Sequence, residues 1–172
     1  MTNSENENSL PIEALSKDGF IIDQALTKGL NYGRLSSDIN GCGWIAMYNM
    51  MHALMLKTSY QNVYQKMNDI LIYHGYLGTP MKTMKAFLDM SELSYQIVKG
   101  KNNALKSALI SEVGIIRYFE GNELHFVTYQ RKDNDQYRFF NAISGKHDHL
   151  LSMNDFFTQH CRLPFVLVIV LK

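Results

Sequence analysis

The hydrophobic positions in the first half of the chain recur mostly at three- and four-residue steps, which is the spacing of one face of an α-helix. This pattern predicts three helices, over residues 43–56, 59–73 and 80–90. In the first of them the apolar stripe consists of Trp44, Met47, Tyr48, Met51, Leu54 and Met55. Thr79 is expected to cap the third helix, with Pro80 at its first position. Shorter helical turns are expected over residues 11–14 and 21–26.

The apolar period changes to alternation in the second half, after Gly114, and alternation is typical of strands. The pattern predicts strands over 115–119, 124–130, 136–142 and 165–171, and a short earlier strand over 95–98. The last segment is apolar on both faces, so we expect it inside the sheet. Helices are expected over 103–110 and 152–160. Helices followed by antiparallel strands indicate an α+β fold, in which N-terminal helices pack against a C-terminal antiparallel sheet.

Composition and charge limit the number of domains and the classes of partner that we expect. The chain has 172 residues, of which 46% are hydrophobic, and we expect one domain over 10–172 after a polar, frayed segment at 1–9. The formal net charge of +1 gives no electrostatic case for binding nucleic acid or an anionic membrane. The chain lacks a signal pattern and an apolar run long enough to span a bilayer, so a cytoplasmic location is expected. Delivery by a route without such a signal stays open.

Cys42 stands between Gly41 and Gly43, directly where the first long helix is expected to begin. Unpaired N–H groups and the helix dipole stabilise a thiolate at that end, which lowers the pKa of a thiol and makes it nucleophilic. The two glycines present no Cβ, so a substrate carbonyl can approach closely. The alternative is a cysteine that is simply packed in the core, which is common for this residue type.

His125 lies within the strand expected over 124–130, where a histidine is often a packed core residue. A turn centred on Asp133 pairs it directly with Asn141 of the next strand, on the same face of the sheet. The Asn141 side chain can then hold one ring nitrogen and leave the other to face a thiol. A shift of the register by one residue moves Asn141 to the opposite face.

These residues resemble the papain-like cysteine peptidase superfamily. The segment from Gly41 to Ala46 is similar to the nucleophile segment of that group, and His125-Phe126-Val127 followed by Asn141 is similar to bacterial double-glycine leader (bacteriocin-processing) peptidases and their relatives. The resemblance spans residues 35–145. It implies a papain-like fold and a thiol-dependent hydrolase acting on a peptide or acyl substrate. It also implies that Cys42 is the nucleophile, His125 the general base and Asn141 the residue that orients the imidazole.

One position departs from the superfamily pattern. A glutamine usually precedes the cysteine as a donor to the oxyanion, and Ser36 stands at that position here. Asn40 carries a carboxamide close to the cysteine and is the expected substitute, beside the backbone N–H of Cys42.

Two other functions remain open at this stage. The same residues can transfer an acyl group from a thioester carrier, and a catalytically inactive papain-like domain can bind peptides. His147, Asp148 and His149 are potential metal ligands, but they follow a polar segment typical of a solvated turn. We therefore expect neither a metal nor a cofactor. The sequence does not indicate an oligomeric state.

Overall fold

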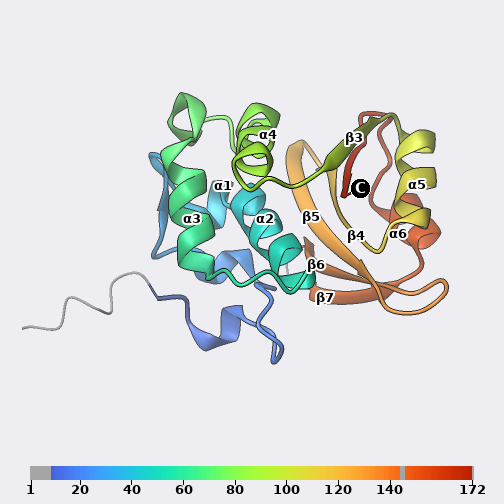
Figure 1. The fold of residues 1–172 in the computed structure, drawn as a ribbon, viewed down its shortest axis with the longest axis horizontal. Helices are drawn as coiled ribbons and strands as arrows, with labels where there is room; N and C mark the ends of the chain where they lie inside the picture. The colour runs from blue at the N-terminus through green and yellow to red at the C-terminus, as the bar shows by residue number, and fades with distance from the viewer. Residues whose placement is uncertain (1–8, 144–145, 172) are drawn as a thin grey trace, which may run out of the picture.

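The computed structural model describes residues 9–143 and 146–171, so the segment expected to be frayed lies, except for Ser9, outside the described residues. The strands form one six-stranded antiparallel sheet in the order β3-β8-β4-β5-β6-β7 (Figure 1). Their bounds are β3 (Tyr95–Lys99), β4 (Val113–Glu120), β5 (Glu123–Arg131), β6 (Tyr137–Ile143), β7 (Lys146–Leu151) and β8 (Leu167–Leu171). β8 pairs with a neighbour on each side, as its two apolar faces predict. β7, by contrast, lies in a segment for which the sequence predicted no strand.

The first half of the chain is helical, as its periodicity predicts. The α-helices are α1 (Ser37–Asn40), α2 (Cys42–Ala53), α3 (Tyr60–Asp69), α4 (Met81–Met90), α5 (Lys101–Ile110) and α6 (Met153–Gln159). Short 3-10 turns η1 (Ile12–Ala14), η2 (Gln24–Thr27) and η3 (Ile72–Gly75) and a small hairpin of β1 (Asn31–Tyr32) and β2 (Leu35–Ser36) connect them. Thr79 does not cap α4, since that helix follows Pro80 without a side-chain cap. The Thr79 side chain packs against Gly43 instead.

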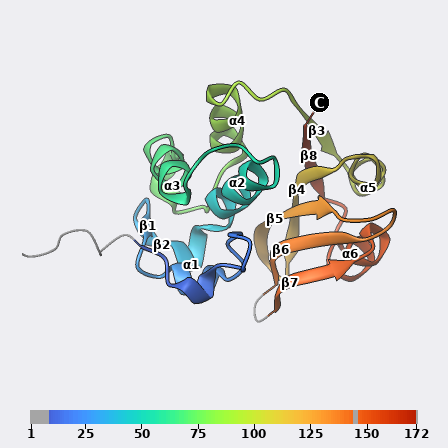
Figure 2. The ribbon, with the colours of Figure 1, turned by 60° about the horizontal axis from the view of Figure 1, so that its bottom comes forward.

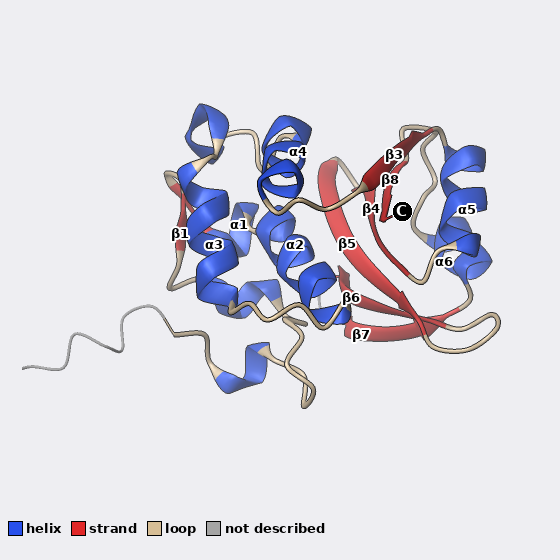
Figure 3. Ribbon diagram, in the orientation of Figure 1, coloured by secondary structure: helices blue, strands red, loops and turns tan. Residues whose placement is uncertain are grey.

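Helices cover both faces of the sheet. Alternate residues of β4 separate the two cores: Ile115 packs with α2, α3 and α4, whereas Ile116 and Tyr118 pack with α5 and α6. Figure 1 and Figure 2 both show α2 and α4 on one side of the sheet, with α5 and α6 on the other. The secondary-structure colouring of Figure 3 shows the same layers. The chain thus has an α+β fold with N-terminal helices packed on an antiparallel sheet.

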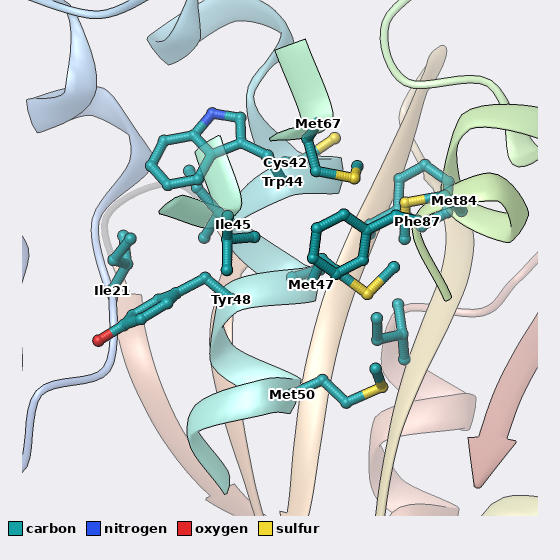
Figure 4. Close-up of a cluster of buried hydrophobic side chains, with 14 of the residues drawn as sticks. Ile21, Cys42, Trp44, Ile45, Met47, Tyr48, Met50, Met67, Met84 and Phe87 are labelled. Carbon is teal, nitrogen blue, oxygen red and sulfur yellow. The ribbon is translucent and has the colours of Figure 1, made fainter. Parts of the chain in front are cut away.

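Helix α2 is buried on all sides over its first nine residues, Cys42 to Met50, and not along one stripe only. Tyr48 points toward Ile21 on one side, while Met47 and Met50 extend from the other side (Figure 4). Asn49 is the polar exception on this helix. Its carboxamide accepts from Ile21 N–H at 2.8 Å and donates to Ile21 C=O at 2.8 Å, so its burial leaves both groups satisfied. A helix that is apolar all round belongs at the centre of a core.

The chain before α1 is held against both α2 and β6. Tyr48 donates a hydrogen bond to the Gly19 carbonyl at 2.9 Å. Arg138 of β6 makes an ion pair with Asp18, and its guanidinium lies over the rings of Phe20 and Phe140, 5.1 and 4.7 Å from their centres. This segment is therefore part of the folded core.

The ion pair between Asp18 and Arg138 predicts a pH dependence. Hydrogen bonding by Arg138 is the main cause that holds the pKa of the Asp18 carboxyl well below its usual range. Stability from a depressed pKa is present above the unfolded pKa of about 3.9 and is lost as the pH falls toward the folded value. We expect Asp18→Asn to lower the free energy of unfolding by up to about 1 kcal/mol at pH 7, because the carboxylate is half-exposed. In urea unfolding this difference should shrink at pH 3, and equal differences at both pH values would contradict the assignment.

Candidate active site

Cys42 is the first residue of α2 and is buried, with 6% of its surface exposed. Gly41 links α1 to α2 in helical conformation, with φ −78° and ψ −5°. A Cβ at Gly41 would lie 2.4 Å from the Ser37 carbonyl oxygen, and one at Gly43 would lie 2.3 Å from the Thr79 side chain. The space that a side chain would need at each glycine is thus occupied by other atoms of the protein. Packing therefore explains the absence of a side chain at both positions, and the close approach of a substrate carbonyl stays a prediction.

His125 lies on β5 at the place where β5 and β6 separate. The ladder between them ends with the pair Thr128 and Phe140. Beyond that pair, side chains of β4 and β5 donate hydrogen bonds to the β6 carbonyls in place of the β5 backbone. His125 Nε2 donates to the Asn141 carbonyl at 2.7 Å, and the Tyr118 hydroxyl donates to the Ala142 carbonyl. Buried carbonyls need such partners wherever a ladder stops. The imidazole is therefore held by the main chain of β6.

The register differs from the one that the sequence predicted. The pair Thr128 and Phe140 centres the hairpin on Asn134 and not on Asp133, so direct pairing of His125 with Asn141 is wrong. Asn141 also adopts a left-handed conformation with φ 59°, next to an irregularity in the pairing of β6 with β7. Asparagine tolerates this conformation better than most residues. The local bend presents the carbonyl of Asn141 to His125 and turns its side chain toward Gln24.

The Asn141 carbonyl decides which nitrogen of His125 carries the proton. A carbonyl oxygen only accepts, so Nε2 must be protonated, and Nδ1 is the nitrogen left for Cys42. Burial lowers the pKa of His125, but its interaction with the Cys42 side chain, the Asn141 carbonyl and the charge of Glu120 outweigh burial and raise that pKa. The protonated ring is thus favoured where a thiolate can face it.

Cys42 and His125 are positioned together by the packing of α2 across β5. The Thr128 hydroxyl donates to the Ala46 carbonyl of α2 at 2.6 Å in the buried interior. Both residues lie within a few positions of the candidate pair, one on each element. This bond therefore fixes the helix against the strand close to the site.

Asn40 does not fit the oxyanion role expected for it. Its amide nitrogen donates to the Tyr32 carbonyl at 2.8 Å and to the Gly75 carbonyl at 3.1 Å. Both N–H groups of the carboxamide are therefore used within the protein, and the side chain is buried. Asn40 joins the β1 strand and the η3 turn to the start of α2. Ser36, at the position of the family's glutamine, donates its hydroxyl to the Lys28 carbonyl.

The remaining candidate groups do not form a second site in the described part of the chain. Cys161 is buried, and burial raises the pKa of its thiol to about 12. Among the side chains that the structure describes, no group of three potential metal ligands lies close enough to hold an ion. The side chains of His147 and Asp148 lie outside the described residues. Over residues 9–143 and 146–171, no helix has both the length and the apolarity required to cross a bilayer.

Comparison with solved structures finds a similar fold in the crystal structure of the peptidase domain of Streptococcus ComA, a bifunctional ABC transporter involved in a quorum-sensing pathway. The superposition has a TM-score of 0.57 and covers 77% of this chain and 91% of that domain, at 12% sequence identity. The fold is that of a papain-like peptidase domain. No protein-family model and no curated protein matches the sequence. The likeness is therefore one of fold.

Sequence reasoning missed Gln24, Tyr118 and Glu120, which surround the candidate pair. Tyr118 stands opposite His125 in the ladder, and its ring meets the imidazole edge-on, with centroids 5.7 Å apart. Glu120 ends β4 with its Oε2 3.3 Å from the Tyr118 hydroxyl, and its charge acts on His125. Pairing of the two strands predicted over 115–119 and 124–130 could have indicated these two residues. Gln24 carried no such signal.

Proposed function

We propose that the protein is a cysteine peptidase that hydrolyses a peptide or amide bond through an acyl-enzyme on Cys42. The observation that carries this proposal is the interaction of Cys42 with a histidine whose other ring nitrogen is already bound. This arrangement is the minimum that nucleophilic catalysis by a thiol requires. The peptidase activity of the structural neighbour supports a peptide substrate.

The chemistry follows from the two side chains. Nδ1 of His125 takes the thiol proton, and the Cys42 thiolate attacks the substrate carbonyl carbon. The backbone N–H of Cys42, at the positive end of α2, stabilises the oxyanion. The imidazolium protonates the leaving amine as the C–N bond breaks and a thioester forms. Water then gives a proton to His125 and displaces the thiol, which releases the acid.

The test is cleavage of a mixed peptide library, read by mass spectrometry, together with labelling of the protein by iodoacetamide across pH. We expect the wild-type protein to cleave peptides, the Cys42→Ala variant to be inactive and the Cys161→Ala variant to retain activity. Labelling at Cys42 should be rapid below pH 7, and labelling at the buried Cys161 slow. Equal slow labelling of both thiols with no cleavage would refute the proposal. New amides or esters in place of free acids would indicate acyl transfer.

A further inference from the structure

Gln24 connects the two halves of the candidate site through three hydrogen bonds. Its backbone N–H donates to Asn141 Oδ1 at 3.0 Å, and its Oε1 accepts from Asn141 Nδ2 at 3.1 Å. Its Nε2 donates to the Asp38 carbonyl at 3.0 Å. Asp38 lies in α1, four residues before Cys42, and Asn141 lies on β6, where its carbonyl holds His125. One side chain thus joins the element before the nucleophile to the strand that orients the base.

The orientation of both carboxamides is fixed by main-chain groups at each end. The Gln24 backbone N–H requires an acceptor, so Asn141 must present Oδ1 to it and Nδ2 to the Gln24 side chain. The Asp38 carbonyl requires a donor, so Gln24 must present Nε2 to it and Oε1 to Asn141. Reversing either amide would place like atoms together at a main-chain group. The chain of hydrogen bonds therefore has one consistent arrangement.

Asn141 needs this support because the sheet does not supply it. The ladder between β5 and β6 has ended at Phe140, and the left-handed backbone of Asn141 carries a conformational cost for a residue other than glycine. The Asn141 side chain is buried and makes both of its described hydrogen bonds with Gln24. Gln24 is thus placed to keep the Asn141 carbonyl at its 2.7 Å contact with His125.

We propose that Gln24 is a positioning residue for the pair of Cys42 and His125. Asn141 then acts on the imidazole through its main-chain carbonyl, and its carboxamide acts only through Gln24. This inference rests on the proposed function for its catalytic meaning, but the hydrogen-bond relay can be tested without it. The competing account is that the Asn141 carboxamide orients His125 directly.

The variants Gln24→Ala, Asn141→Gly and the double variant separate the two accounts. Glycine keeps the carbonyl at position 141 and adopts a left-handed backbone readily, so it removes the carboxamide alone. We expect each single variant to lower kcat about 10- to 100-fold through misplacement of the imidazole, with a smaller change in KM. The kcat of the double variant should lie no more than about twofold below that of the less active single variant, because both changes break the same connection. Losses that multiply in the double variant would overturn the proposal.

Two further variants control for general damage to the fold. Gln24→Glu keeps an acceptor for Asn141 Nδ2 and the size of the side chain, but it sets a carboxylate oxygen against the Asp38 carbonyl. This variant should therefore also lose activity. Gln65→Ala removes a glutamine that bonds Asp69 on the exposed face of α3, and it should match the wild type. Full activity in Gln24→Ala or Gln24→Glu would refute a positioning role.

The closing experiment is an NMR titration of the nitrogen-labelled histidines, which needs no activity. The titratable groups that face His125 are Cys42 on α2 and Tyr118 and Glu120 on β4, and all of them remain in these variants. Loss of the carbonyl contact should lower the pKa of His125 in Gln24→Ala, Gln24→Glu and Asn141→Gly, and weaken the preference for the Nε2–H tautomer. An unchanged titration in all three would overturn the relay. A shifted titration in a protein that cleaves no peptide would support the relay and count against the proposed function.

Discussion

Replacing His125 with alanine is expected to lower kcat for peptide hydrolysis by about 10²- to 10⁴-fold, the usual contribution of a general acid–base residue. The variant should also lose rapid labelling of Cys42 below pH 7. The reason is that the Cys42 side chain interacts with His125 and raises the pKa of the imidazole, so the ring is placed to accept the thiol proton. Without the ring, labelling of Cys42 should be slow. Single-turnover peptide cleavage and mass spectrometry of the labelled protein measure the two effects.

His52→Ala is the matched control for this experiment. His52 lies near the other end of α2, where its Nε2 contacts the Asp18 carbonyl at 2.7 Å. Its loss should leave the pH dependence of Cys42 labelling unchanged, even where it lowers stability. Retention of low-pH labelling in His125→Ala would show that helix α2 alone activates the thiol, and the pairing with His125 would have to be abandoned.

The Gly43→Ala substitution is expected to lower the free energy of unfolding by about 1–3 kcal/mol, the usual cost of overpacking a core. The added methyl group would meet the Cβ and Oγ1 of Thr79 at 2.3 Å, and the branched Thr79 side chain has few alternative rotamers. Both residues are buried beside Cys42, so the strain falls on the start of α2. We therefore expect a loss of hydrolysis together with the loss of stability. Urea unfolding and peptide cleavage measure the two effects.

Gly29→Ala is the corresponding control, since an added Cβ at that position has no neighbour within 4 Å. It should leave both stability and activity close to those of the wild type. A Gly43→Ala protein as stable as the wild type would mean that the η3–α4 connection moves aside at little cost. The glycine would then be explained by access to the sulfur, as the sequence first suggested.

The elements that could be predicted from the sequence are those with a clear local period. Strands β4 and β5 and the long helices α2, α3 and α4 alternate or repeat over enough residues to define a buried face. Strand β7 could not be predicted, because its polar sequence pairs only with β6 at the edge of the sheet. The complete burial of α2 depends on the segments that fold over it, such as the Ile21 backbone bound by Asn49.

The candidate site also contains residues whose roles could be predicted from the sequence and residues whose roles could not. Cys42 and His125 could be found because a helix start and a strand place each side chain from local sequence alone. The roles of Asn40 and Asn141 could not, since the partners of their carboxamides come from Tyr32, Gly75 and Gln24. A polar side chain next to a reactive group has many possible partners, and only the folded chain decides among them. For Asn141, a shift in the hairpin register and a left-handed backbone mean that its main-chain carbonyl, and not its side chain, binds His125.

The position of β8 has a consequence for biosynthesis. This strand is inserted between β3 and β4, both of which leave the ribosome well before it. Until residues 167–171 are translated, the nascent chain therefore holds two unpaired strand edges, which are templates for association with other chains. The hydrogen bonds on both sides of β8 thus form after the other strands of the sheet have been translated. Termination before residue 167 would thus leave β3 and β4 without the strand that joins them.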